Sequence, residues 1–288
     1  MNKQKNIEKS INAETVATAE RERERERVVP FGHNKKVIEL LWTGGWDSTF
    51  RMVELSRQFV TIQPIYIISK DRNSKKKELT ATEKIRQALI TDSRTNAKIL
   101  DIKLINKNDI PENMEITTAW ERIHQLTKLG TQYEWIARYA LLNPGLEIGV
   151  EKGDPDVSYA NCALRKYGKL IEIDKDSSKF KVDPENSNSD VVKVLGNLTF
   201  PIIEKTELEM KKLIKEWGYE DIMKMIWFCH TPIHNQPCGL CRPCNEKIES
   251  NMEWLLPEEA LKRNANVSKH TILNIPYKIY RKLMSKIN

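Results

Sequence analysis

The sequence contains no long hydrophobic run and few cysteines. No apolar stretch approaches the roughly 18 residues that would span a bilayer, and residues 1–27 hold no hydrophobic segment of the kind that a secretory signal needs. We therefore expect a soluble, cytoplasmic protein with no membrane partner. Five cysteines in 288 residues are too few for a disulfide scaffold. The hydrophobic fraction of 40% is still enough to form a core, which excludes a disordered chain.

Acidic residues are missing from the C-terminal end. Residues 262–288 hold seven of the 47 lysines and arginines and no Asp or Glu, so the other 261 residues contain 40 basic and 40 acidic side chains. The body of the chain is neutral and its tail is basic. Such a tail is usually solvated, but it is also a candidate contact for a protein partner or for nucleic acid.

Hydrophobic periodicity predicts an α/β fold. Short apolar runs at 37–42, 62–68, 99–105 and 146–150 alternate with helical patterns at 78–93 and on either side of Gly130. This alternation indicates a doubly wound, mostly parallel sheet. After it, residues 174–190 are expected to form a polar surface excursion, Leu208 to Trp217 an amphipathic helix ended by Gly218, and residues 245–255 a helix.

The chain divides into three parts by composition. Residues 1–32, which include an alternating Arg-Glu run, are expected to be a flexible charged arm. Residues 33–226 form the predicted α/β domain. Residues 227–288 form a C-terminal module that carries a cysteine cluster and the basic tail.

The cysteine cluster is typical of a metal site. Cys229, Cys238, Cys241 and Cys244 supply four soft ligands within 16 positions, at spacings that suit one tetrahedral zinc ion. Four thiolates leave no open coordination position. We therefore expect Zn²⁺ to be structural.

A glycine turn follows the first predicted strand. The segment Thr43-Gly44-Gly45-Trp46-Asp47-Ser48-Thr49 places backbone N–H groups, two glycines and three hydroxyls at the N-terminus of a helix, an arrangement that binds anions. Asp47 is a candidate ligand for a Mg²⁺ ion that offsets phosphate charge. The alternative is an ordinary turn in which Asp47 only interacts with the helix dipole.

This turn resembles the pyrophosphate loop of the PP-loop ATP pyrophosphatase superfamily, Ser-Gly-Gly-x-Asp-Ser, with Thr43 in place of the first serine. Members of the superfamily adenylate a substrate oxygen by attack on the α-phosphate of ATP and release pyrophosphate. The resemblance implies that ATP is bound through its pyrophosphate part by Thr43, Gly44, Gly45, Asp47, Ser48 and Thr49.

Further segments make the chain similar to the 7-cyano-7-deazaguanine synthase (QueC) family over about residues 36–255. They are the cysteine cluster with Gly239 and Asn245, the stretch from Asp156 to Cys162, and Pro201 with Lys205-Thr206-Glu207. The resemblance implies that ATP adenylates 7-carboxy-7-deazaguanine, that ammonia then gives an amide, and that a second adenylation dehydrates the amide to the nitrile preQ0. It implies catalytic roles for Asp47 and Lys205, substrate contacts for Asp156, Ser158, Tyr159 and Asn161, and a homodimer.

The chain departs from this family near the substrate. Asn161 stands where Asp is usual, its segment lacks a Gly and a Pro, and Gly130-Thr131-Gln132 replaces a Gly-Arg-Asn element. Together with the arm and the tail, these differences suit a diverged QueC-like enzyme of bacterial antiviral defence. In such an enzyme the deazaguanine carboxylate would be joined to another amine, on a protein.

Two functions of other classes remain open. A PP-loop tRNA sulfur transferase would need Cys162, the one cysteine outside the cluster, although a single cysteine of this kind is more often a core residue. A zinc-containing nucleic-acid-binding module without catalysis would use the cysteines and the basic tail, but it leaves residues 43–49 unexplained.

Overall fold

The central sheet confirms the α/β prediction. The computed structural model describes residues 37–70, 74–174 and 178–271. Six strands form one sheet in the order β3-β2-β1-β5-β8, with β4 also paired to β2, and the pairings between these strands are parallel. The strands are β1 (Val37–Leu41), β2 (Thr61–Ile68), β3 (Lys98–Ile99), β4 (Lys103–Asn106), β5 (Leu146–Ile148) and β8 (Leu198–Thr199).

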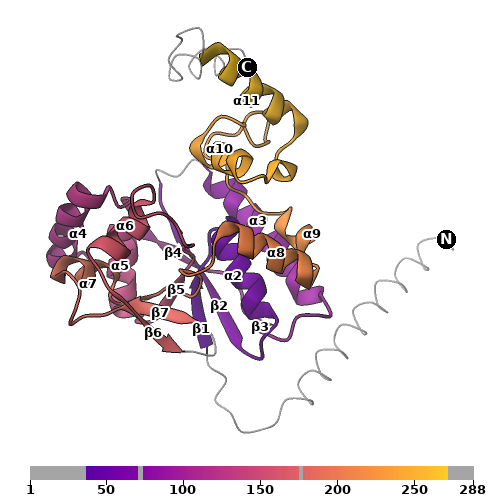
Figure 1. The fold of residues 1–288 in the computed structure, drawn as a ribbon. Coiled ribbons are helices and arrows are strands. Elements are labelled where there is room, and N and C mark those ends of the chain that lie inside the picture. Colours follow the sequence, from indigo (N-terminus) through magenta and orange to yellow (C-terminus); the bar gives the residue numbers. More distant parts are fainter. Residues whose placement is uncertain (1–36, 71–73, 175–177, 272–288) are drawn as a thin grey trace. The chain divides into compact units, whose positions relative to one another are not determined.

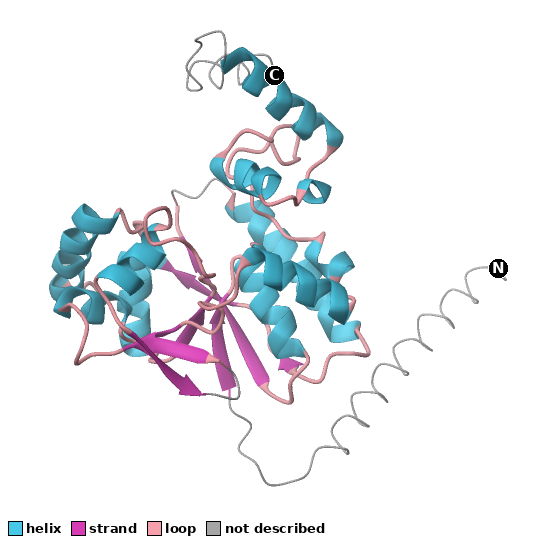
Figure 2. Ribbon diagram, viewed as in Figure 1, coloured by secondary structure: helices cyan, strands magenta, loops and turns pink. Residues whose placement is uncertain are grey.

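Helices cover both faces of this sheet (Figures 1 and 2). One face packs against α2 (Trp46–Ser56), α3 (Lys75–Thr91), α8 (Glu207–Trp217) and α9 (Glu220–Met223). The other packs against α4 (Met114–Thr127), α5 (Gln132–Leu142), α6 (Tyr159–Lys166) and α7 (Ser189–Leu195). A short 3₁₀ helix, η1 (Lys107–Asp109), precedes α4. Strand side chains alternate between the two cores, with Leu40 in the first and Leu41 in the second.

The chain reverses its direction of winding at β1. Strands β2 and β3 follow β1 on one side, whereas β5 pairs with β1 on the other side. At such a switch point the connections leave the sheet in opposite directions, and the carboxyl ends of the two strands open a crevice. Any ligand site of this fold is therefore expected beyond Leu41 and Ile148.

Local sequence signals fix the ends of α8. Thr206 accepts a hydrogen bond from the Glu209 amide, and the Glu209 carboxylate accepts one from the Thr206 amide, which forms a capping box. Gly218 ends the helix in a left-handed conformation, as predicted. Leu208, by contrast, is 74% exposed, and the buried face of the helix is formed by Met210 and Ile214.

Two predicted segments take a different form. The apolar run 99–105 is divided into β3 and β4, and at the interruption Arg86 donates to the Leu100 carbonyl and to the Asp101 carboxylate. The polar region 174–190 contains β7 (Lys179–Val182), which pairs antiparallel with β6 (Leu170–Asp174). This hairpin joins the domain through a bridge between Phe180 and Phe200.

The C-terminal module consists of α10 (Arg242–Glu249), the 3₁₀ helix η2 (Glu253–Leu255) and α11 (Glu258–Thr271). The predicted helix at 245–255 therefore starts earlier and ends earlier than expected. The proposed arm at 1–32 and the tail beyond residue 271 lie outside the described residues. None of the described helices has both the length and the apolar character needed to cross a membrane.

Candidate ligand cavity and metal centre

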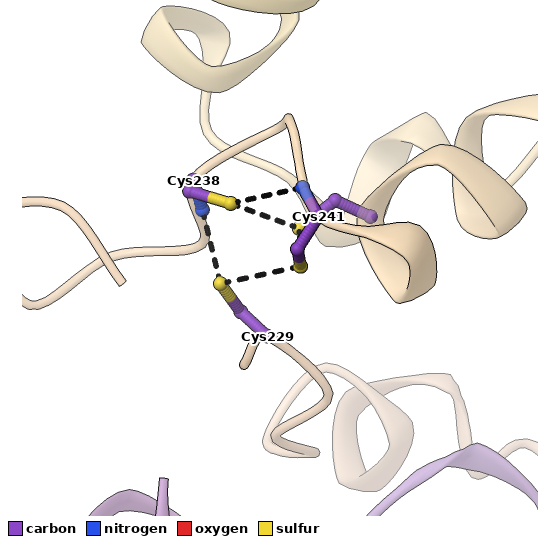
Figure 3. A group of neighbouring side chains, drawn as sticks. Cys229, Cys238 and Cys241 are labelled. Atoms are coloured by element: carbon purple, nitrogen blue, oxygen red, sulfur yellow. Dashed lines mark hydrogen bonds between the residues drawn. The ribbon is translucent and has the colours of Figure 1, made fainter. Parts of the chain in front are cut away.

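The four clustered cysteines form a site that can hold a metal ion such as zinc. All four are buried, and their Sγ atoms lie within 4.8 Å of one another. Figure 3 shows the thiols of Cys229, Cys238 and Cys241 pointing toward one another. The Sγ atom of Cys241 lies 3.5 Å from that of Cys244 and 3.8 Å from that of Cys229, and the Cys238–Cys244 separation is 3.9 Å. A tetrahedron with metal–sulfur bonds of about 2.3 Å has edges of about 3.8 Å.

Backbone amides support negative charge on these sulfurs. The amides of Leu240 and Cys241 donate to the Cys238 Sγ atom at 3.3 and 3.2 Å, and the Cys238 amide donates to the Cys229 Sγ atom at 3.2 Å. Metal binding requires thiolates, and hydrogen bonds to the charged form stabilise it. The loop is therefore shaped for ligand thiolates.

Gly239 allows this loop to pack against α11. Its φ angle is +76°, and a Cβ atom at this position would lie 2.1 Å from the carbonyl oxygen of Ala260. No side chain fits that space. The sequence signal for this requirement was the glycine itself, between two of the cysteines.

A cavity of about 290 Å³ lies at the carboxyl ends of β1 and β5. Its polar wall comes from the turn after β1, from the segment after β5 and from α10, and its apolar wall comes from strand ends and α5. The lining residues include Leu41, Thr43, Gly45, Trp46, Asp47, Ser48, Ile67, Tyr133, Ile136, Ile148, Glu151, Glu246 and Lys247. The cavity occupies the crevice that the strand order predicts.

The glycine turn presents the N-terminus of α2 to this cavity. Gly44 has a φ angle of +73°, and its carbonyl accepts a hydrogen bond from the Trp227 amide at 2.8 Å. Gly45 is the N-cap and supplies no capping side chain. The Thr43 and Ser48 hydroxyls lie 3.5 Å apart beside the first turn. The helix dipole and these hydroxyls together favour an anion.

Thr49 does not belong to this lining. Its side chain is fully buried, and its Oγ1 atom accepts a hydrogen bond from the Trp42 indole at 3.1 Å. The helix turns this side chain toward the core, so the Thr49 hydroxyl does not face the cavity, and the pyrophosphate contact predicted for Thr49 stays a prediction. Gly44 contributes through the shape of the turn and is not among the lining residues either.

Two carboxyl groups of the cavity have raised pKa values. Burial raises the pKa of Asp47 from 3.8 to about 6, Lys247 opposes this rise, and Glu207 and Glu246 add to it. Burial and then the charge of Asp47 raise the pKa of Glu151 from 4.5 to about 8. The Glu151 Oε2 atom is buried and has no hydrogen-bond partner among the described residues. A cation in this cavity would therefore be bound favourably.

The positive charge of the cavity comes from an unexpected residue. Among the described residues of the lining, Lys247 of α10 is the only one with a positive charge. Lys205, which was the predicted cation, lies outside the lining and pairs with Glu54 at 3.5 Å. This arrangement does not support the predicted catalytic role of Lys205.

The predicted substrate residues lie in and beside α6. Asp156 is exposed and pairs with Lys166, and Ser158 caps α6 by accepting from the Asn161 amide. Tyr159 is 45% exposed, with the guanidinium of Arg242 from α10 over its ring at 5.3 Å. None of the four residues lines the cavity.

Asn161 lies outside the cavity lining, but its side chain binds the backbone of a residue that lines the cavity. It is 1% exposed, and its Nδ2 atom donates to the Glu151 carbonyl at 3.0 Å and to the Ser158 hydroxyl at 3.1 Å. Its Oδ1 atom accepts from Arg165. The residue therefore holds the segment that carries Glu151.

Glu151 and Lys247 are charged residues of the cavity lining that the sequence analysis did not single out. Glu151 follows β5 by three positions, and Lys247 follows Cys244 by three positions. The first signal was an acid just beyond the end of a predicted strand. The second was a lysine on the same helix face as a predicted metal ligand.

Comparison with known proteins gives no further assignment. No protein-family model matches the chain, and no curated protein is similar to it in sequence.

Proposed function

We propose that this protein is an ATP-dependent ligase of the PP-loop type, which activates a carboxylate by adenylation in the cavity between β1 and β5. One observation carries the proposal. The N-terminus of α2 has no capping side chain, is flanked by the Thr43 and Ser48 hydroxyls, and lines a cavity at the switch point of a parallel sheet. This is the place and the chemistry with which an α/β fold binds phosphate groups.

The substrate that we propose is the carboxylate of a 7-deazaguanine, 7-carboxy-7-deazaguanine. A carboxylate oxygen attacks the α-phosphorus of ATP, the bond to the leaving pyrophosphate breaks, and an acyl adenylate forms. An amine then attacks the acyl carbon, AMP leaves, and the amine gives up a proton. Ammonia yields an amide, which a second adenylation can dehydrate to the nitrile. The apolar wall with Tyr133 and Ile136 suits a planar ring.

A divalent cation fits the donor set of this cavity. Asp47 and Glu151 offer hard oxygen ligands with raised pKa values, and Mg²⁺ prefers such ligands together with phosphate oxygens and water. Among the described residues, only the cysteines gather three or more potential ligands, so the phosphates would complete the coordination. Bound Mg²⁺ would offset the repulsion between these carboxylates and ATP.

Zinc is the metal that we propose for the cysteine site. Four thiolates at tetrahedral separations favour Zn²⁺ and leave no position for a substrate. The module contributes Glu246 and Lys247 to the cavity, so a structural metal also shapes the ligand site.

The test is product analysis of the purified, zinc-loaded full chain. The protein is incubated with Mg·ATP and 7-carboxy-7-deazaguanine, with and without ammonium, and products are identified by mass spectrometry beside an Asp47→Ala control. Formation of AMP, pyrophosphate and an amide or nitrile, absent in the control, is the expected result. A stalled adenylate would point to another amine, such as one on a protein partner, as in a defence enzyme. Absence of AMP and pyrophosphate would overturn the proposal.

A further inference from the structure

Lys247 is a charged residue in a buried position. Its side chain is 10% exposed, and its Nζ atom pairs with Glu207 of α8 and lies 5.4 Å from the ring centroid of Trp46. Burying an ammonium is costly unless it is paired. Because its ammonium is held by Glu207 beside the Trp46 ring and the residue lines the cavity, Lys247 is directed to the cavity and away from bulk solvent.

The cysteine site determines where Lys247 lies. Cys241 is the N-cap of α10, and Cys244 lies three residues before Lys247, on the same face of the helix. Two contacts join the module to the domain near this point. Trp254 meets Trp46 edge to face at 6.4 Å, and Lys211 of α8 donates to the Asn251 carbonyl at 2.7 Å. A metal held by the cysteines therefore fixes the helix that carries the cation.

A buried hydrogen-bond donor, the indole N–H of Trp46, lies in the same part of the cavity wall as Lys247. Trp46 lines the cavity and is 3% exposed, yet its indole N–H has no partner in the part of the chain that the structure describes. Buried donors are almost always paired, so this donor indicates a missing acceptor. An oxygen of a bound anion would satisfy it, next to the ammonium that lies over the same ring.

The ion pair between Glu207 and Lys247 can be broken at low cost to Glu207. Glu207 is the first residue of α8, where the helix dipole stabilises a carboxylate. The helix dipole therefore still stabilises the Glu207 carboxylate when the Lys247 ammonium moves to a stronger acceptor. A phosphate, with its higher charge, is such an acceptor.

We propose that Lys247 is a phosphate-binding residue supplied by the metal module, which exchanges Glu207 for a phosphate of the bound nucleotide and makes nucleotide affinity depend on the metal. This inference rests on the proposed function, because it assigns the phosphates of that ligand to the Lys247 side of the cavity. The metal does not contact the nucleotide; it affects nucleotide affinity by fixing the position of the Lys247 side chain.

The experiment measures binding of inorganic pyrophosphate and of Mg·ATP to the zinc-loaded full chain by titration calorimetry. Lys247→Met keeps most of the apolar stem and removes the charge. We expect it to weaken binding of both probes about tenfold or more, the effect of losing one charge-assisted hydrogen bond. Lys247→Arg should stay within a few-fold of the unmodified chain. The matched control is Lys212→Met, which removes a lysine of α8 that makes an exposed pair with Glu216 outside the cavity, and should leave affinity unchanged.

Two further variants keep the inference testable if Lys247→Met does not fold. Glu207→Gln frees the ammonium, so pyrophosphate should bind at least as tightly as to the unmodified chain. Cys244→Ser should lower metal content and weaken Mg·ATP binding. Where Lys247→Met does fold, adding it to Cys244→Ser should cause little further loss. Unchanged affinity in Lys247→Met, or a tenfold loss in Glu207→Gln, would overturn the inference alone. In that case Asp47→Ala would still abolish turnover. Failure of the unmodified chain to bind either probe would overturn the proposed function as well.

Discussion

The Nζ atom of Lys247 lies 5.4 Å from the ring centroid of Trp46, so the cysteine-rich module and the glycine turn are in direct contact. Trp46 is the first residue of α2, and Lys247 belongs to the helix that begins at the metal site. A change in the position of α10 should therefore also affect the glycine turn and the start of α2. The ligand cavity and the metal centre should respond together to changes in either.

Removal of the metal should loosen the module and leave the sheet intact. A chelator, or Cys241→Ser, should reduce the metal content from one ion per chain and increase amide hydrogen exchange in α10, because the buried cluster depends on the four ligands. Amides of β1 and β2 should remain protected. The control is Cys162→Ser, which changes the cysteine outside the site. Equal exchange in the metal-loaded and metal-free protein would contradict this expectation.

Gly239→Ala should destabilise the module by more than backbone strain alone. Gly239 and Gly145 both have positive φ angles, +76° and +91°, so alanine is strained at either position. At Gly239 the added Cβ atom would also meet the Ala260 carbonyl oxygen at 2.1 Å, whereas nothing lies within 4 Å at Gly145.

The comparison of these two variants isolates the steric effect. We expect Gly145→Ala to cost about 1 kcal/mol, and Gly239→Ala to cost more and to weaken metal binding. Denaturant midpoints and metal titrations measure both effects. If the two variants lost equal stability and bound metal equally, close packing on α11 would not matter.

Glu147→Gln should be strongly destabilising. Glu147 of β5 is 3% exposed at its side chain and pairs with Arg51 at 2.8 Å and with Lys179 at 2.6 Å. Removing one member of a buried ionic network leaves uncompensated charge, with a typical cost of about 3–5 kcal/mol. Chemical denaturation measures the loss, and Glu258→Gln, in an exposed pair with Lys262, is the control that should change little.

The same group sets a pH dependence at the acidic side. Burial opposes ionisation of Glu147, but Arg51 and Lys179 outweigh it and lower its pKa below the usual 4.5. The stabilising contribution is therefore complete above the unfolded pKa and is lost as the pH falls through the folded value. Acid unfolding that is equally steep in Glu147→Gln and in the unmodified chain would contradict this role.

Glu151→Gln should make the unliganded protein more stable at high pH. Its carboxyl faces Asp47 of α2, Glu207 of α8, and Glu246 and Lys247 of α10, and its pKa is raised to about 8. A raised carboxyl pKa means that ionisation is disfavoured in the fold, so stability falls as the pH rises from about 4.5 through 8. The neutral amide avoids this penalty.

Thermal midpoints between pH 5 and pH 9 test this prediction. The variant and the unmodified chain should be similar near pH 5 and should diverge with rising pH, with the variant higher. Glu112→Gln, at an exposed position, should follow the unmodified chain. Parallel profiles for Glu151→Gln and the unmodified chain would show that the Glu151 carboxyl is not under strain from burial.

Several features could be predicted from the sequence because they are local. The alternation of apolar runs and helical patterns predicted the parallel α/β sheet, but it did not show the break between β3 and β4, where Arg86 bonds the Leu100 carbonyl. The spacing of four cysteines indicated a single metal site, and the thiols do converge. Most of the turn at 43–49 lines the cavity, but the Thr49 hydroxyl bonds Trp42 in the core, which the local sequence pattern does not show.

By itself, the amino-acid sequence determined the fold class, the cysteine cluster and the position of the glycine turn, since each depends on residues close together in the chain. Only the tertiary structure decided which charges enter the cavity. Lys247 reaches it from α10 and Glu151 from the segment after β5, while Lys205 is held by Glu54. Packing between distant segments controls which ionisable groups are buried together, and no local pattern encodes the cost of their desolvation.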